Sequence, residues 1–132
     1  MMFVETSTIV GILLEEPDKK DLLARLHAAV GPVTSVVNEV EAAISIGRRI
    51  RDFTLAGKLV GDFLEKAGIR VLPVTPDIYE DVVRAYARYG KGTGHAAKLN
   101  FGDCFSYAIA KQAGIRLLCK GNDFTQTDIS LA

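Results

Sequence analysis

The sequence lacks a net charge, a long apolar run and a secretion signal. It has 16 Lys or Arg and 16 Asp or Glu residues among 132, so its formal net charge is zero and no global field attracts nucleic acid. No apolar run reaches the length of about 20 residues that a membrane helix needs, and Met1–Glu5 has no signal-type basic region. We therefore expect a single cytoplasmic domain over residues 1–132.

Cysteine is scarce, and several common catalytic motifs are absent. Cys104 and Cys119 lie in apolar runs without C-x-x-C spacing or a neighbouring histidine. We expect two buried free thiols in a reducing compartment rather than a disulfide or a metal-binding pair. The chain contains no G-x-S-x-G sequence, no P-loop and no G-x-G-x-x-G sequence, so the chemistries that those motifs support are not indicated.

Short strand-like segments alternate with segments of helical periodicity. The expected strands are residues 2–4, 33–34, 69–74 and 116–119. The expected helices are residues 7–14, 18–30, 35–51, 52–66, a segment from 75 onward, and 103–113. In the helix at 35–51, we expect the core face to hold Val37, Val40, Ile44 and Ile46. Strands separated by helices indicate an α/β sandwich with a mainly parallel central sheet.

Four carboxylates stand in settings where a lone ionised side chain would be unfavourable. Glu5 follows the first strand, Glu41 lies in an apolar part of a helix, Asp103 opens a helix, and Asp123 follows the last strand. Sites in parallel sheets form beyond the carboxyl ends of the strands. Oxygen ligands suit Mg²⁺ or Mn²⁺, which lower the pKa of bound water and stabilise a phosphoryl transition state. We therefore expect the four acids to converge on one metal site.

Each acid also has a simpler interpretation that the sequence leaves open. Glu5 could cap the helix that follows it, and Glu41 could face solvent. Asp103 would be favoured by a helix dipole in any case, and Asp123 could form an Asx turn. Asp128 could cap a turn or act as a further ligand. The set of four, rather than any single acid, carries the prediction.

Three further residues are candidates for contacts to a phosphate group. His95 lies in a glycine-bearing loop, Lys91 lies in the same loop, and Arg48 stands at the end of a helix. His95 could instead have a packing role in its loop, and the two cations could simply belong to solvated surfaces.

Five segments together resemble a known family. They are Val4–Ser7, Glu41–Ile44, Leu99–Phe105, Gly121–Phe124 and Thr127–Ile129. In these segments the chain is similar to the PIN-domain ribonucleases, and most of all to the VapC toxins of bacterial VapBC toxin–antitoxin operons. The resemblance implies a PIN-like three-layer α/β/α sandwich and an Mg²⁺- or Mn²⁺-dependent endoribonuclease that cleaves RNA, commonly tRNA or rRNA, to inhibit translation. It also implies a homodimer and a cognate VapB antitoxin whose tail occupies the acidic site.

The resemblance assigns roles to particular residues. It makes Glu5, Glu41, Asp103 and Asp123 the catalytic acids, with Glu5, Asp103 and Asp123 as metal ligands. The hydroxyl that follows the first acid falls on Thr6 or Ser7, and Ser7 is the expected site contact. Substrate contacts are then expected from Ser7, Arg48, Lys91, His95 and Asp128.

One departure from the family pattern affects the expected activity. The family has Asp where this chain has Glu5, and the extra methylene extends the carboxylate by about 1.5 Å. Mg²⁺ demands near-ideal geometry at about 2.0–2.1 Å, so reduced activity is one expectation. The alternative function is therefore a catalytically weakened or silent PIN module that binds RNA or a partner without cutting.

Overall fold

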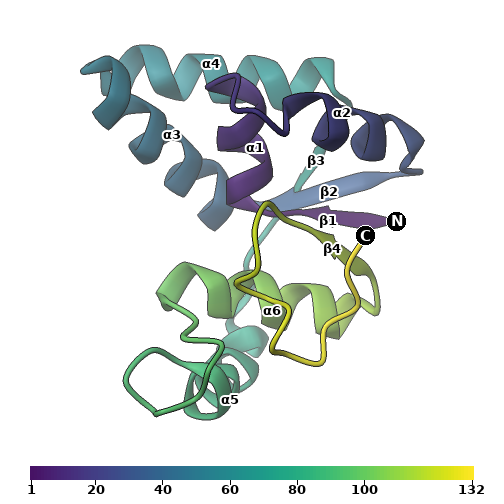
Figure 1. Ribbon diagram of the computed structural model, residues 1–132, viewed down its shortest axis with the longest axis vertical. Coiled ribbons are helices and arrows are strands. Elements are labelled where there is room, and N and C mark those ends of the chain that lie inside the picture. The colour runs from purple at the N-terminus through teal and green to yellow at the C-terminus, as the bar shows by residue number, and fades with distance from the viewer.

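A four-stranded parallel sheet lies at the centre of the computed structural model, which describes residues 1–132 (Figure 1). The strand order is β3-β2-β1-β4, and all three neighbouring pairs are parallel. The strands are β1 (Met2–Val4), β2 (Pro32–Ser35), β3 (Arg70–Leu72) and β4 (Arg116–Leu118). The prediction of an α/β fold with a mainly parallel sheet is confirmed, and the strand expected at 69–74 is shorter than predicted.

Helices cover both faces of this sheet. On one face lie α1 (Thr6–Leu13), α2 (Lys19–Ala28), α3 (Val36–Ile50) and α4 (Phe53–Lys66). On the other face lie the 3-10 helix η1 (Pro76–Ile78), α5 (Tyr79–Tyr89) and α6 (Phe101–Ala113). This is the three-layer α/β/α arrangement that the family resemblance implied. No helix is both long enough and apolar enough to cross a membrane.

The alternation of side chains along each strand divides the apolar core in two. Phe3, Val33 and Leu117 belong to the cluster that packs against α5 and α6. The next residues along, such as Val4 and Leu118, belong to the cluster that packs against α1 to α4. Because successive residues of a strand point to opposite faces, β1 and β4 each supply apolar side chains to both layers.

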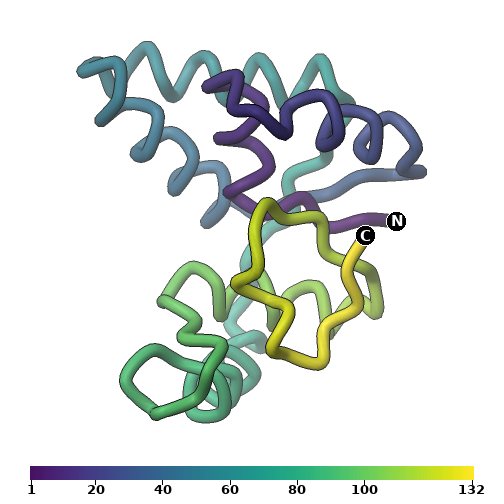
Figure 2. The backbone as a smooth tube through the Cα atoms, viewed as in Figure 1, coloured from purple at the N-terminus to yellow at the C-terminus, as the bar shows by residue number.

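The C-terminal segment leaves β4, crosses α6 and returns to the same strand (Figure 2). Its end is held by hydrogen bonds from the Leu117 amide to the Ser130 carbonyl and from the Ala132 amide to the Leu117 carbonyl, both at 2.9 Å. Phe124, which belongs to this segment, is buried in the core. Residues 121–132 are therefore ordered by packing and by these bonds, although they form no helix or paired strand of their own.

Two details of the helices differ from the prediction. In α3, Val40 is 51% exposed and Ile44 is 41% exposed, whereas Ala42 and Ile46 are the apolar side chains in the core. The helix is turned so that Ala42 faces the core, which leaves Val40 and Ile44 on the surface. In α6, Asp103 is the third residue rather than the first, because Asn100 caps the helix.

Both cysteines are free thiols, as predicted. Cys104 is buried and Cys119 is half-buried, and burial raises the pKa of Cys104 to about 11 and that of Cys119 to about 12. Neither thiol is therefore ionised near neutral pH.

Candidate active site

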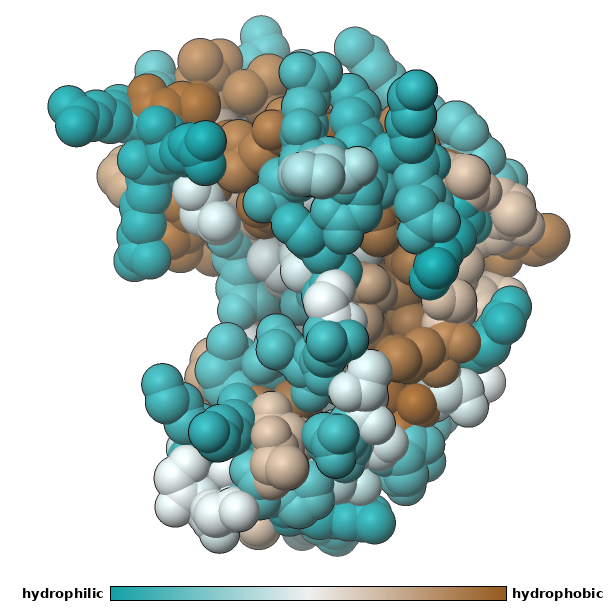
Figure 3. All heavy atoms as spheres, viewed as in Figure 1, coloured by the Kyte–Doolittle hydropathy of each residue, from teal (hydrophilic) through white to brown (hydrophobic).

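A hollow of about 350 Å³ opens beyond the carboxyl ends of β1 and β4. Four chain segments line it, and the molecular surface is deeply hollowed between the α3 side and the α6 side (Figure 3). Its lining residues are Glu5, Thr6, Ser7, Val10, Glu16, Glu41, Ser45, Asn100, Asp103, Lys120 and Asp123. All four acids expected at the site are among them, and we refer to this feature as the acidic hollow.

Glu5 is at once the cap of α1 and a wall of the acidic hollow. Its Oε2 accepts hydrogen bonds from the Ser7 amide at 2.8 Å and from the Ser7 hydroxyl at 2.5 Å. The side chain is buried, and burial raises its pKa to about 7 despite these bonds, with further contributions from the charges of Asp103 and Glu41. The capping interpretation and the site interpretation are thus compatible.

Ser7 joins Glu5 to the segment that follows β4. Its hydroxyl oxygen accepts a hydrogen bond from the Lys120 amide at 2.8 Å while its proton is donated to Glu5. This places Ser7 in the acidic hollow, where the family resemblance expected it.

Glu41 reaches the acidic hollow from the middle of α3 and is held by two contacts. Its Oε1 accepts a hydrogen bond from the Thr6 hydroxyl at 2.8 Å. Its carboxylate also lies directly against Gly102 in the first turn of α6, where any β-carbon would overlap it. Burial of Glu41 raises its pKa, and the Thr6 bond acts in the opposite direction.

A buried polar chain stands behind this contact. Asn38, which has no exposed surface, donates hydrogen bonds to the Thr6 hydroxyl at 3.0 Å and to the Ser106 hydroxyl at 2.8 Å. Its own side-chain oxygen accepts from the Ser35 hydroxyl at 2.6 Å. The amide of Asn38 therefore fixes the orientation of the Thr6 hydroxyl that binds Glu41. The family resemblance offered Thr6 only as the alternative to Ser7, and no sequence pattern singled out Asn38.

Asp103 and Asp123 complete the acidic lining. Asp103 accepts a hydrogen bond from the Asn100 amide at 3.1 Å as part of the capping box of α6. Burial raises the pKa of Asp103 to about 6, and the charges of Asp123 and Glu41 add to this shift. Asp123 is exposed and accepts no hydrogen bond from the protein.

The donor set of the acidic hollow consists of oxygen atoms, which is the set that a hard divalent cation prefers. Glu5, Glu41 and Asp103 each have one carboxylate oxygen bonded to the protein, and burial raises the pKa of all three, so their ionised forms are disfavoured without a positive charge nearby. As the side chains stand, no three acidic, histidine or cysteine groups are close enough together to hold an ion. The chemistry of the lining fits Mg²⁺ or Mn²⁺, and the carboxylates would have to rotate toward one another to share an ion.

The PIN domain family model matches residues 2–130. The chain belongs to the PIN domain family. Among its relatives is a VapC ribonuclease of Rhizobium meliloti, which is 42% identical over 98% of this chain and 99% of its own length. Among solved structures, Mycobacterium tuberculosis VapC20, described as a Sarcin-Ricin loop cleaving toxin, has a TM-score of 0.81 at 18% identity and covers 100% of this chain and 98% of its own. A toxin–antitoxin complex from Klebsiella pneumoniae has a TM-score of 0.71 at 14% identity, over 100% of this chain and 97% of its own.

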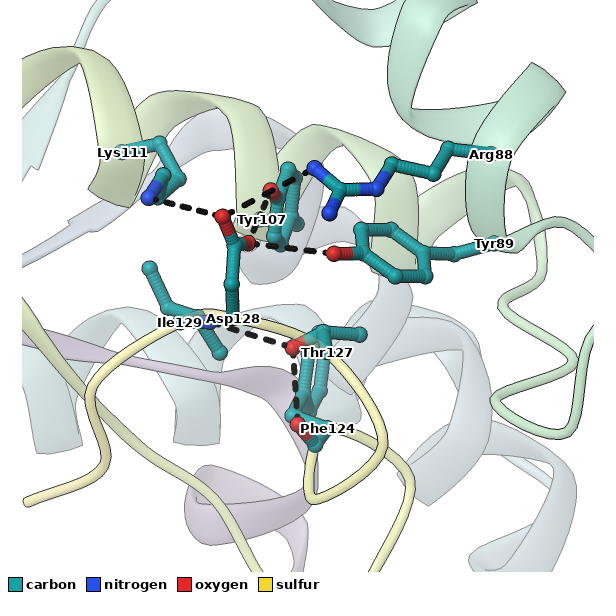
Figure 4. Close-up of polar contacts among 8 residues, drawn as sticks. All are labelled: Arg88, Tyr89, Tyr107, Lys111, Phe124, Thr127, Asp128 and Ile129. Atoms are coloured by element: carbon teal, nitrogen blue, oxygen red, sulfur yellow. Dashed lines mark hydrogen bonds and ion pairs between the residues drawn. The ribbon is translucent and has the colours of Figure 1, made fainter.

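In this PIN domain, Asp128 lies outside the acidic hollow and in a cluster of its own (Figure 4). Its carboxylate accepts hydrogen bonds from the hydroxyls of Tyr107 and Tyr89, and it pairs with Lys111 at 3.2 Å and Arg88 at 3.7 Å. The Tyr107 bond, followed by Lys111, lowers the pKa of Asp128. These contacts fasten residues 121–132, which include Asp123, to α5 and α6.

The three other expected substrate contacts also lie outside the acidic hollow of the PIN domain. Arg48 is exposed near the end of α3, and Lys91 is exposed on the loop after α5. His95 packs edge-on against Tyr89, with ring centres 4.9 Å apart, and its Nδ1 accepts from the Ala97 amide at 3.0 Å. The structure thus gives His95 a packing role in its loop, and the substrate roles of Arg48, Lys91, His95 and Asp128 stay predictions.

Proposed function

We propose that this PIN domain is an Mg²⁺- or Mn²⁺-dependent endoribonuclease toxin that cleaves RNA, such as tRNA or rRNA, and so inhibits translation. The observation that carries the proposal is the convergence of Glu5, Glu41, Asp103 and Asp123 in one hollow from four separate parts of the chain. The ribonuclease name of a relative that is 42% identical over nearly the whole chain supports the same conclusion.

Within this proposal the residues of the acidic hollow have different roles. Glu5, Asp103 and Asp123 would hold the ion, which when bound supplies polarisation of a phosphoryl oxygen and a bound water of lowered pKa. Glu41, fixed by Thr6 and by its contact with Gly102, would accept a proton or complete the ligand set. Ser7 binds one oxygen of Glu5, Oε2, and leaves the other without a hydrogen bond from the protein.

The alternative, a silent PIN module, is not favoured. Its basis was the length of Glu5, yet this carboxylate lines the acidic hollow with the other three acids. Burial also raises its pKa to about 7, so its ionised form is disfavoured unless a positive charge lies beside it. The degree to which the extra methylene slows cleavage is tested by the Glu5 variants described in the Discussion.

We expect a VapB-type antitoxin as partner, as well as a homodimer and a cytoplasmic location. The Klebsiella neighbour is described as a toxin–antitoxin complex, and an Arg side chain of a partner could bridge two carboxylates of the acidic hollow by a bidentate fork.

For the dimer, an apolar hollow of about 350 Å³ lies between α5 and α6 and is lined by Val82, Val83, Tyr86, Ala87, Phe101 and Cys104. An exposed apolar surface of this kind marks an interaction site.

The decisive experiment is RNA cleavage by the purified chain. Total RNA is incubated with the protein in Mg²⁺, in Mn²⁺ and in excess EDTA, and products are followed by gel electrophoresis and end mapping. We expect discrete fragments with either ion and none with EDTA. The matched control is Asp103→Asn, which removes one carboxylate and should abolish cleavage. Intact RNA in all conditions, or equal cleavage by Asp103→Asn, would refute the proposal.

A further inference from the structure

Lys120 is the only basic side chain that lines the acidic hollow. The other ionisable side chains around it are five carboxylates: Glu5, Glu16, Glu41, Asp103 and Asp123. A phosphodiester group that enters such a site meets charges of its own sign, and a metal ion offsets only part of them. The positive charge of Lys120 in the wall of the hollow therefore offsets part of this repulsion.

The backbone of Lys120 is fixed to the catalytic wall. Lys120 stands two residues after β4, and its amide donates to the Ser7 hydroxyl at 2.8 Å. Ser7 in turn donates to Glu5. The base of the Lys120 side chain is thus positioned by the same hydroxyl that orients an acid of the site.

The tip of the side chain is held by two acids that can release it. Nζ lies 3.1 Å from Glu16 Oε1 and 3.5 Å from Asp18 Oδ1, and both acids belong to the turn between α1 and α2. The Lys120 side chain is 30% exposed, so these pairs are in contact with water. Such solvent-exposed pairs are weak, and a Lys ammonium on its flexible stem exchanges readily between anionic partners.

We propose that Lys120 binds a phosphate group of the RNA at the acidic hollow, leaving Glu16 and Asp18 as the phosphate arrives. The proposal rests on the proposed ribonuclease function. The competing explanation is a brace, in which Lys120 only holds the turn between α1 and α2 against β4. The two explanations predict opposite effects of Glu16→Gln on RNA binding. If Lys120 is a brace, the loss of Glu16 loosens the turn and weakens binding. If Lys120 binds phosphate, the loss of Glu16 frees its ammonium group and tightens binding.

Binding can be measured apart from cleavage. The probe is a 5′-fluorescein-labelled, 12-nucleotide, mixed-sequence single-stranded RNA, titrated by anisotropy in Ca²⁺ over a series of KCl concentrations. Each phosphate neutralised on a single strand contributes about 0.7 to the slope of log K against log salt concentration. We expect Lys120→Met to reduce this slope by about 0.7 and to weaken binding by about 10-fold. Lys120→Arg should keep the slope.

Two controls separate charge from position. Lys58→Met makes the same change of net charge at an exposed position of α4, a helix that contributes no residue to the acidic hollow, and should leave the slope unchanged. Glu16→Gln should tighten RNA binding, opposite in sign to Lys120→Met. Thermal unfolding of each variant confirms that equal amounts of folded protein are compared.

The results that overturn the inference are distinct from those that overturn the ribonuclease function. A wild-type slope for Lys120→Met, or equal weakening by Lys120→Met and Glu16→Gln, would leave Lys120 as a brace only. If Lys120→Met lowers the slope as expected while the wild-type protein cuts no RNA with Mg²⁺ or Mn²⁺, the phosphate contact is retained and the proposed function is refuted.

Discussion

Gly102→Ala tests whether the place of Glu41 matters for cleavage. The β-carbon of an alanine at this position would lie 2.6 Å or less from all three atoms of the Glu41 carboxylate group. Ordinary contact needs about 3.5 Å, so the carboxylate must move by about 1 Å or more. Because the overlapping atoms are the end of a flexible side chain, Glu41 rotates away and loses its bond from Thr6 rather than disrupting α6.

The expected outcome combines near-normal stability with a large loss of rate. Replacing a helical glycine by alanine favours folding by about 0.5–1 kcal/mol, which offsets the about 1 kcal/mol lost with one hydrogen bond. A displacement of about 1 Å at a catalytic group can cost about 100-fold in rate. We therefore expect a melting temperature close to that of the wild type and an initial cleavage rate about 100-fold lower, similar to that of Glu41→Gln.

Gly61→Ala is the matched control for this experiment. Gly61 lies in α4, and a β-carbon there meets no atom within 4 Å. This variant should gain about 0.5–1 kcal/mol of stability and cleave at the wild-type rate. Wild-type cleavage by folded Gly102→Ala would refute the reasoning, since it would mean that Glu41 acts from elsewhere or does not act.

Three further predictions concern the acids. Glu5→Asp should raise the initial cleavage rate and Glu5→Gln should abolish cleavage, measured at equal folded concentration; equal rates for all three forms would show that Glu5 is not a ligand. The pKa of Glu5 is raised to about 7 and that of Asp103 to about 6, so the folded state holds protons that the unfolded state has released above about pH 4.5. Stability in EDTA should therefore fall as pH rises from about 4.5 to 7, as urea unfolding can measure, and a flat profile would contradict the burial of these acids. Asp128→Asn removes the charge that pairs with Lys111, and we expect about 1 kcal/mol of destabilisation with faster hydrogen exchange in residues 121–132; unchanged exchange there would exclude a fastening role for Asp128.

The sequence was sufficient to predict the layers and the position of four acids around one hollow, whereas their sharing of an ion stays a prediction. Local composition predicted the strands at 2–4 and 116–119, and in a parallel sheet the carboxyl ends of both strands lie at the same edge. Glu5 and Asp123, which follow these strands, are brought to that edge by topology alone. Such inferences need only local propensity and the geometry of a βαβ unit.

The rotation of helices and the course of an irregular segment depended on contacts between distant residues. Periodicity could not decide that Val40 faces solvent and Ala42 the core, because either apolar set satisfies the same repeat. Likewise Asp128, five residues after Asp123, is directed to Tyr107 and Lys111 on α6 rather than to the acidic hollow. The sequence by itself determined which chemical groups meet at the end of the sheet. Only the tertiary structure decided that Gly102 makes room for Glu41 and that Lys120 stands among the acids, because both depend on side chains brought together from segments more than 60 residues apart.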